Sequence, residues 1–281
     1  MLVKTFSKSI VGIVIPAILA TMINMGYAAT GPNSSHDPYL ISSMPGVSFT
    51  SILTVSDSVN NKSDGTPYVM VGIPDGLGAY DNKDGTFTIL MNHELKSDKG
   101  IQREHNRTDP NGKGVFVSKW IVNKRGLAVL HGEDLIRKVK LWDGASESFL
   151  DSTNAVFNRL CSADLPDSEA LFNRKTRKGY NGYIFMNGEE TTGGRAFAHI
   201  VNGPEAGTSY ELPSLGKISW EQDEESSGII DVTKLFKGVD GYYTKKYRYF
   251  LLDVQAHKTG VPYNTPEIVE GGQLLLMQVL R

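Results

Sequence analysis

The 281-residue chain has a single cysteine, Cys161, so no disulfide bond can form within it. It also lacks any long block of lysine and arginine, since 29 basic residues oppose 31 acidic ones for a formal net charge of −2. Nucleic acid is therefore not expected as a partner. The chain is 40% hydrophobic, with 29 glycines and 12 prolines, which excludes a wholly disordered chain, a collagen and a disulfide-stapled miniprotein.

Several common catalytic motifs are missing as well. No Gly-x-Ser-x-Gly, His-Glu-x-x-His or Walker sequence occurs, which argues against a serine hydrolase, a zinc protease and a nucleotide hydrolase. Residues 75–81 hold two glycines after a predicted strand but lack the third glycine and the helix of a dinucleotide-binding fingerprint. We interpret this segment as a turn that lets the backbone approach a site.

The N-terminal segment has the features of a secretory signal. Two lysines precede an acid-free, mostly apolar stretch at residues 10–23, and small residues follow it. This pattern predicts a signal peptide over residues 1–29, cleaved after Ala28 or Ala29, and export to the periplasm or out of the cell. The short apolar run and Pro16 within it argue against a stable membrane anchor.

The rest of the chain is expected to be one all-β domain over residues 30–281, with a net charge of −4 because the leader removes two lysines and no acids. Short runs rich in Val, Ile, Phe, Tyr and Leu alternate with Gly, Asn, Asp and Pro. Residues 81–86 and 123–126 place a glycine late in the loop, as hairpin turns require. The predicted strands are 67–74, 86–92, 115–122, 127–131, 182–186, 196–201, 217–220, 247–254 and 273–280. This pattern is typical of antiparallel meanders.

Three segments are predicted to be other than strands. An acid and a serine after Pro166 predict a short helix at residues 168–174. The Ser-rich stretch at residues 33–61 predicts a loosely structured segment, and residues 234–247 predict a solvated, basic and aromatic loop.

Three of the predicted strands have weakly similar sequences. Residues 88–94 and 183–190 each run apolar into Met-Asn and then into ligand-type side chains, and residues 249–257 run apolar before Gln and His. Innermost strands that line a shared channel deliver such groups at one end, and β-propellers are the common architecture of this kind. At about 40 residues per blade, the chain would suffice for roughly five or six blades.

The acids at these strand ends are the strongest candidates for chemistry. Adjacent acids such as Glu189 and Glu190, together with Glu94, need cations to be stable after a buried strand. Carboxylates and a nearby imidazole suit Ca²⁺, Mn²⁺ or iron. The alternative is that Glu189 and Glu190 begin an exposed loop and that His93 is a hydrogen-bonded edge residue. Cys161 is either buried and inert, paired with another chain, or a metal thiolate.

Other polar residues in the sequence can be interpreted either as functional or as purely structural. Arg159 and Arg195 could each receive a phosphate through paired hydrogen bonds, or serve as structural arginines. The acidic run at residues 223–228 reads as a solvated turn. His199, inside a strand-like run, reads as a hydrogen-bonded core histidine.

Taken in order, these segments resemble the PhoX-type alkaline phosphatases and their phytase-like exported relatives. The resemblance covers most of residues 67–281. The segments that carry it are Val71–Gly78, Met91–Glu94, Arg159–Ser162, Asn187–Glu190, Glu225–Gly228 and Leu252–His257. Each motif is short, but their order is much more specific than any one alone.

The resemblance implies a β-propeller whose channel holds a cluster of Fe³⁺ and Ca²⁺ and hydrolyses small-molecule phosphate esters. By the same resemblance, Cys161 becomes a metal ligand rather than an inert core residue. The implied metal ligands are Glu94, Cys161, Glu189, Glu190, Glu225 and His257, with Gln255 at the end of the same strand as His257. The candidate catalytic set is Glu94, Glu189, Glu190 and the phosphate-binding candidate Arg195.

The chain departs from this family at one position in particular. In those relatives a long stretch separates a Trp-Glu segment from the Glu-x-Ser/Thr-Gly segment, whereas here residues 218–222 run directly into residues 223–228. A propeller shortened near 222–223 would close with fewer blades, be completed by a partner chain, or keep unsatisfied strand edges.

Two classes of function follow from these observations. The first is an exported, metal-dependent phosphoester hydrolase. The alternative is a catalytically inactive, calcium-stabilised, propeller-like binding module, which the shortening favours. An esterase or lactonase on a similar fold is a third reading.

Overall fold

A computed structural model describes residues 28–217, 228–257, 260, 262 and 265–281. The predicted leader lies outside this range except for Ala28 and Ala29, and most of the predicted strand at 217–220 and the predicted ligand Glu225 also lie outside it. Among the described residues, no helix has both the length and the apolar character needed to cross a membrane.

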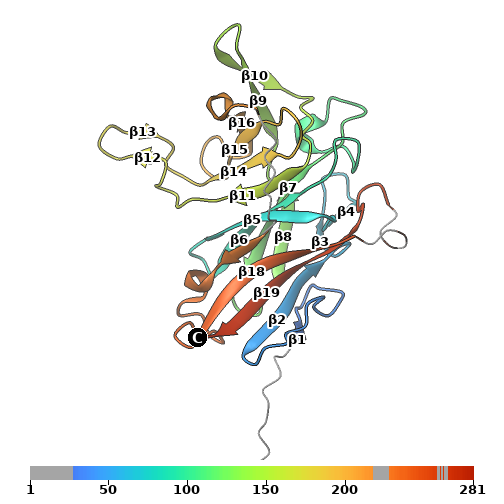
Figure 1. The fold of residues 1–281 in the computed structure, drawn as a ribbon, viewed down its shortest axis with the longest axis vertical. Coiled ribbons are helices and arrows are strands. Elements are labelled where there is room, and N and C mark those ends of the chain that lie inside the picture. The colour runs from blue at the N-terminus through green and yellow to red at the C-terminus, as the bar shows by residue number, and fades with distance from the viewer. Residues whose placement is uncertain (1–27, 218–227, 258–259, 261, 263–264) are drawn as a thin grey trace, which may run out of the picture.

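The described chain is built almost entirely of strands (Figure 1). The strands are β1 (Ala28–Thr30), β2 (Val47–Thr54), β3 (Ser58–Asn61), β4 (Pro67–Val69), β5 (Pro74–Asp81), β6 (Thr86–His93), β7 (Phe116–Asn123), β8 (Val129–Asp134), β9 (Lys138–Asp143), β10 (Ser148–Ser152), β11 (Leu160–Asp164), β12 (Phe172–Asn173), β13 (Lys178–Gly179), β14 (Ile184–Glu189), β15 (Ala196–Ile200), β16 (Thr208–Glu211), β17 (Ile229–Asp231), β18 (Tyr247–Ala256) and β19 (Gly271–Leu280). Three short 3-10 helices are η1 (Glu104–Asn106), η2 (Pro213–Leu215) and η3 (Thr233–Phe236). The predicted all-β class is confirmed.

Three larger sheets organise these strands. The five-stranded sheet has the order β1-β2-β19-β18-β17, the four-stranded sheet β5-β6-β7-β8, and the six-stranded sheet β10-β9-β16-β15-β14-β11. The pairs β3–β4 and β12–β13 form small sheets of their own. Neighbouring strands are antiparallel except for β1–β2 and β9–β16, and none of the sheets in the described part closes on itself.

The three larger sheets are stacked, with the four-stranded sheet in the middle (Figure 1). One hydrophobic core fills the space between the five-stranded and four-stranded sheets, with Trp120, Tyr249 and Phe87 among its fully buried members. A second core, with Phe157, Phe185 and Phe197, lies between the four-stranded and six-stranded sheets. Each sheet alternates its side chains between two faces, so the middle sheet contributes to both cores.

The three larger sheets meet at β5, an edge strand of the four-stranded sheet. Strands β5, β11 and β17 are edge strands of their sheets, and β5 contacts β11, β17 and β18. The sheets therefore converge at β5, and residues at the ends of these strands come from segments far apart in the sequence.

Both predicted hairpin turns are confirmed. Residues 81–86 join β5 to β6, with Lys83 and Gly85 at φ values of 67° and 91°. The second turn joins β7 to β8, and Gly126 lies at φ 84°. A positive φ is readily adopted by glycine, which explains the late position of the glycine in each loop.

The predicted helix at residues 168–174 is wrong. The segment forms a turn and then enters β12, which pairs with β13. The Asn173 side-chain oxygen accepts hydrogen bonds from the backbone N–H groups of Lys175 and Thr176, at 3.0 and 3.1 Å. Such a local side-chain bond offers the backbone an alternative to helical pairing.

One segment predicted to be loose is ordered by packing. Within residues 33–61, β2 forms a full strand against β19 and buries Ile52 and Leu53 completely. This expectation failed because the pairing partner of β2 lies far away in the sequence. Residues 237–246, after η3, form a largely exposed loop as predicted, although Phe236 before it is fully buried and stacks on Tyr242 with ring centroids 4.3 Å apart.

Three buried histidines make the folded protein sensitive to acid. Burial lowers the pKa of each of His93, His105 and His199 to about 3, whereas an unfolded histidine has a pKa of about 6.5. The unfolded chain therefore binds more protons than the folded protein between about pH 6.5 and about pH 3. The free energy of unfolding is expected to fall as the pH falls through this window.

Replacing His105 by phenylalanine should reduce this sensitivity. Both ring nitrogens of His105 lack a hydrogen-bond partner, and its ring packs 4.9 Å from that of Phe157. In urea unfolding, the variant should lose about 2 kcal/mol less stability than wild type between about pH 7.5 and about pH 5. The raised pKa of Asp75 acts in the opposite direction but is common to both proteins. Equal losses in the two proteins would contradict the assignment.

Candidate metal centre

Two carboxylates and one thiol from separate segments of the chain meet where the sheets converge. Asp75 lies on β5, Glu94 follows β6 directly, and Cys161 lies on β11. One ligand atom from each lies within 4.8 Å of the others, and all three residues are buried. In the described part of the chain, this is the one such group of three or more potential metal ligands.

The close contact of β5 with β11 brings these residues together. A methyl group at Gly76 would lie 2.6 Å from both the carbonyl oxygen of Cys161 and the backbone nitrogen of Ala163, so only glycine fits. The Asn92 side-chain amide also donates a hydrogen bond to the Cys161 carbonyl oxygen. The Gly-containing segment at residues 75–81 is a strand rather than the predicted turn, but it does let the backbone approach the site.

Asp75 is a buried carboxylate with one oxygen that makes no hydrogen bond. Its side chain is fully buried, Oδ1 accepts a hydrogen bond from the Gly76 N–H at 2.5 Å, and Oδ2 has no partner. Burial, reinforced by the nearby charge of Glu94, raises the pKa of Asp75 to about 7. A buried carboxylate oxygen without a donor is the arrangement that a bound cation would satisfy.

The pKa values of Cys161 and Asp253 are raised, as is that of Asp75. Burial and the charges of Asp75 and Glu94 raise the pKa of the Cys161 thiol to about 12. On β18, the Asp253 Oδ2 atom also lacks a partner, and burial together with the charge of Asp75 raises the pKa of Asp253. A cation among these groups would lower all of these pKa values, because it favours the charged forms.

Glu94 is held in place by an arginine at the surface side of the group. Arg159 donates to Glu94 Oε1 from Nε at 2.9 Å and from Nη2 at 2.6 Å, and Gln255 donates to Oε2 at 3.2 Å. Burial raises the pKa of Glu94, but these hydrogen bonds and that of Glu190 outweigh it, so that the pKa lies below its ordinary value. Arg159 Nη2 also lies 2.7 Å from a Glu190 carboxylate oxygen. The three strand ends with similar sequences, at Glu94, Glu190 and Gln255, therefore lie together around Arg159.

A cleft of about 420 Å³ opens beside this group. Its walls include Glu94 and Arg159 together with Lys96, Lys99 and His257. The carboxylates of Glu94 and Glu270 also line it, and Arg159 is already paired with Glu94 and Glu190, so an anionic group would rely on Lys96 and Lys99.

Glu189 and Arg195 lie away from the group of three and bind each other. Arg195 donates to Glu189 Oε2 from Nε at 2.8 Å and to Oε1 from Nη2 at 2.7 Å. The backbone N–H groups of Asn158 and Arg195 also donate to this carboxylate, at 3.1 and 3.0 Å. Both predicted functional residues are thus engaged in a closed ion pair.

His257 lies at the rim of the cleft. Its side chain is 70% exposed, and its Nδ1 atom lies 2.7 Å from Glu270 Oε2. It is not part of the group of three ligands.

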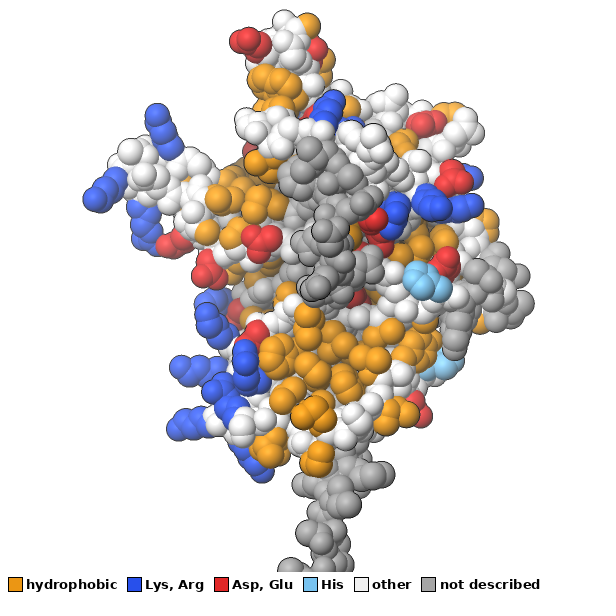
Figure 2. Space-filling view, in the orientation of Figure 1, with side chains coloured by type: hydrophobic (Ala, Val, Ile, Leu, Met, Phe, Trp, Pro, Cys, Tyr) orange, Lys and Arg blue, Asp and Glu red, His pale blue; other side chains and the backbone are white. Residues whose placement is uncertain are grey.

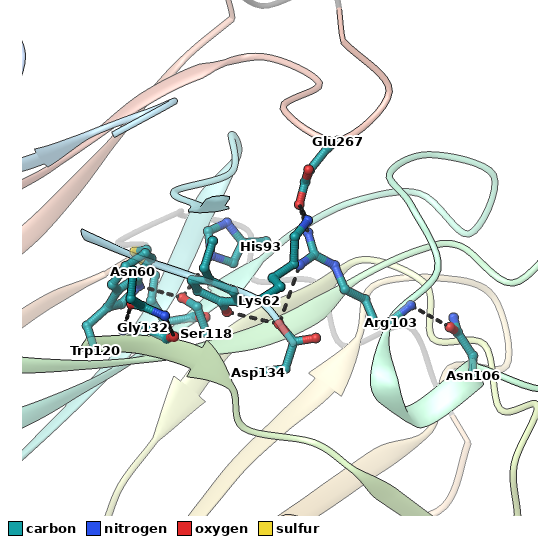
Figure 3. Close-up of polar contacts among 12 residues, drawn as sticks. Asn60, Lys62, His93, Arg103, Asn106, Ser118, Trp120, Gly132, Asp134 and Glu267 are labelled. Atoms are coloured by element: carbon teal, nitrogen blue, oxygen red, sulfur yellow. Dashed lines mark hydrogen bonds and ion pairs between the residues drawn. The ribbon is translucent and has the colours of Figure 1, made fainter. Parts of the chain in front are cut away.

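His93 and His199 serve the core. His93 Nε2 lies 2.9 Å from Ser118 Oγ (Figure 3), and its ring stacks on that of Phe116 at 4.4 Å. The expected hydrogen bond is present, but His93 is fully buried on β6, between β5 and β7, and does not lie at an edge. His199 Nε2 lies 2.9 Å from Asn187 Oδ1. Asn187 in turn donates to Asn92 at 3.0 Å, so a chain of buried polar contacts supports the Cys161 backbone.

A second cleft, of about 640 Å³, surrounds Arg103 and was not predicted (Figure 3). Arg103 is 5% exposed and lies 3.6 Å over the ring of Phe116. It forms ion pairs with Asp134 at 3.4 Å and Glu267 at 3.7 Å, and Lys62 pairs with the same Glu267 at 2.7 Å. The charges at its floor are therefore largely balanced.

Sequence reasoning also missed Asp75 as a ligand. The signal was present as an acid at the start of a buried strand, two residues after the positive-φ residue Ile73.

Two carboxylates and a thiolate form a donor set suited to a transition-metal ion. No known protein family, curated protein or solved structure matches this chain, so the chemistry of the centre is argued from its residues.

Proposed function

We propose that the protein is an exported, metal-dependent hydrolase of small-molecule phosphate esters. The observation that carries the proposal is the buried group of Asp75, Glu94 and Cys161, beside a cleft that is lined by Glu94, Lys96 and Lys99. Carboxylates and a thiolate would bind the metal, and the cations would bind the phosphate. The PhoX resemblance points to the same chemistry.

The donors fit a metal ion that accepts sulfur. The Asp75 Oδ2 atom is buried without a partner, and the thiol of Cys161 lies beside two carboxylates. A thiolate ligand favours iron over calcium, which prefers oxygen donors only. A metal bound by these residues would act as a Lewis acid toward a phosphate oxygen.

The chain's own residues would bind and orient the substrate. Lys96 and Lys99 would attract the phosphate group at the cleft walls. Arg159 and Arg195 are not given a phosphate-binding role, because the first guanidinium is already bound to Glu94 and Glu190 and the second to Glu189.

We also propose that the three larger sheets are blades of a propeller. Their edge strands β5, β11 and β17 converge, and the metal ligands lie at that point, as they would at the axis of a radial arrangement. Three stacked sheets correspond to half of a six-bladed ring.

The test is elemental analysis of the purified protein together with hydrolysis of p-nitrophenyl phosphate. We expect bound iron and turnover that disappears when a chelator removes the metal and returns when iron is restored. A protein that holds no metal after incubation with iron would contradict the proposal.

The two lysines of the cleft make a separate prediction. Replacing Lys96 and Lys99 by alanine should raise KM for p-nitrophenyl phosphate about tenfold, with a small effect on kcat, because both lysines attract the phosphate without touching the metal. Lys237→Ala, an exposed lysine on the loop after η3, is the matched control. Equal KM values for the double variant and the control would place substrate elsewhere.

A binding module without catalysis has one observation in its favour. Arg159 already neutralises Glu94 and Glu190, so the site has a cation of its own. In that case the protein would retain calcium or no metal, and hydrolysis would be absent with every metal tested.

A further inference from the structure

The cleft of about 640 Å³ around Arg103 is lined mainly by polar side chains, in contrast to the hydrophobic side chains that gather over β18 and β19 (Figure 2). Its walls come from residues 60–64, residues 101–104 and strand β8. The Asn60 side chain fastens the first wall to β8, because it donates to the Gly132 carbonyl oxygen at 3.0 Å and accepts from the Gly132 N–H at 2.7 Å. Small-molecule sites in proteins have volumes of about 300–1,000 Å³. The cleft therefore has the size of a ligand site, with walls that are held in place.

Arg103 presents one edge of its guanidinium group that no acceptor occupies (Figure 3). The side chain is 3% exposed and lies over the ring of Phe116. Nη1 donates to Asp134 Oδ1 at 3.4 Å, but Nε and Nη2 have no hydrogen-bond partner in the described part of the chain. Glu267 Oε1, at 3.7 Å from Nη2, is beyond hydrogen-bond distance. The Nε and Nη2 atoms form the edge that binds a carboxylate through two parallel hydrogen bonds, and burying that edge unused costs free energy.

The surrounding chain holds Arg103 in this position. Its backbone N–H donates to Asn106 Oδ1 at 2.8 Å, and Asn106 Nδ2 donates to the Lys113 carbonyl oxygen at 3.1 Å. Lys62 donates to Glu267 Oε1 at 2.7 Å, so the charge of this nearby carboxylate is already neutralised. A ligand that uses the Nε/Nη2 edge therefore finds it in place and does not have to reorganise the site.

A carboxylate lies on the other side of the guanidinium group. Asp134 Oδ1 accepts hydrogen bonds from Arg103 Nη1 and from Tyr68 Oη, the latter at 2.9 Å. Oδ2 accepts none from the described residues, and the side chain lines the cleft with 14% of its surface exposed. Burial raises the pKa of Asp134, because the charge of Arg103 offsets the loss of water only in part. A cation beside Asp134 would favour its charged form, so this carboxylate suits an ammonium group.

The charges around the cleft are equal in number. Four lysine and arginine side chains and four acidic side chains line it. Two of the pairs are closed ion pairs, Arg107 with Glu104 at 2.7 Å and Arg137 with Glu133 at 2.6 Å. A ligand with a net negative charge would meet as many acids as bases, whereas a zwitterion brings one charge of each sign. The charge balance therefore favours a zwitterion over a phosphate ester or another simple anion.

We propose that this cleft binds an amino acid or a similarly small zwitterion. The carboxylate of the ligand would accept two hydrogen bonds from the Nε/Nη2 edge of Arg103, and its ammonium group would donate to Asp134. The remaining volume would hold the side chain of the ligand. Neither residue belongs to the group of three metal ligands, so the inference stands whether or not the protein is a hydrolase.

The first test is the binding of each standard amino acid to the full-length protein, measured by calorimetry with a chelator present so that no metal ion binds the ligand. At least one amino acid should bind with a Kd below about 1 mM. Its primary amide, which lacks the carboxylate, should bind at least about tenfold more weakly, and so should the analogue in which hydrogen replaces the amino group. Absence of binding by all of the amino acids, or an amide that binds as tightly as the acid, would overturn the proposal.

Two substitutions locate the ligand. Arg103→Lys keeps the positive charge but not the paired donors and should raise Kd at least about tenfold. Arg174→Lys, at a 73% exposed arginine that is paired with Glu169 outside the cleft, is the matched control and should leave Kd unchanged. Asp134→Asn should weaken binding of the amino acid but not of the analogue without the amino group.

Wild-type affinity in Arg103→Lys, or equal losses for both ligands in Asp134→Asn, would overturn the assignment of these residues and with it the proposal. The amide and the analogue without the amino group are measured on the wild-type protein. They therefore decide the question even where Arg103→Lys does not fold.

Discussion

Replacing Asp75 by asparagine is expected to remove metal binding and to reduce phosphate ester hydrolysis at least about a hundredfold. Asparagine has the shape of aspartate but lacks the negative charge that a metal ligand supplies. Because Asp75 is fully buried and its Oδ2 atom has no partner, the substitution breaks no hydrogen bond of that oxygen. The fold should therefore survive the loss of metal.

The measurement is metal content by elemental analysis, with hydrolysis and circular dichroism on the same samples. Asp164→Asn, on the same strand as Cys161 but exposed, is the matched control and should keep both metal and activity. Cys161→Ser should behave like Asp75→Asn. Full metal content in Asp75→Asn would remove this carboxylate from the ligand set.

Replacing Glu189 by alanine should instead destabilise the protein by about 3–5 kcal/mol without changing its metal content. The Glu189 carboxylate is 4% exposed and accepts hydrogen bonds from Arg195 and from two backbone N–H groups. Its removal leaves the Arg195 guanidinium and those N–H groups unpaired in a partly buried place.

Urea unfolding and elemental analysis together decide the role of Glu189. Glu189→Gln keeps an acceptor oxygen and should lower the free energy of unfolding by less than Glu189→Ala does. It therefore supplies a folded variant even where Glu189→Ala does not fold. If the glutamine variant loses metal while remaining stable, Glu189 is a ligand, as the family resemblance implies, and the centre rearranges on metal binding.

The sequence patterns anticipated the meeting of strand ends but not the roles of the residues that meet. Apolar runs ending in acids marked Glu94 and Glu190 correctly as neighbours, because a buried strand fixes where its end lies. The patterns could not separate Glu189, the last residue of β14, from Glu190, which directly follows the strand. One consequently pairs with Arg195 and the other with Arg159.

Local turn chemistry was the most reliable guide to the fold. The hairpins at residues 81–86 and 123–126 depend only on their own residues, and both form. Strand β10 was missed although its partner β9 is its neighbour in the sequence. Strands β9 and β11 were missed because their pairing partners include distant segments, and β9 even pairs in parallel with β16. For such strands, tertiary contacts override the weak local signal.

The convergence of β5 and β11 at Gly76 also bears on the order of events when the protein matures. Asp75 and Glu94 lie on one hairpin, which can form early, but Cys161 arrives only when the six-stranded sheet docks on the four-stranded one. Contacts so distant in sequence form slowly. The proposed metal ion would therefore have no complete site in the nascent chain, and its insertion would follow folding instead of directing it. Metal supplied during synthesis and metal supplied to the finished protein should give the same occupancy.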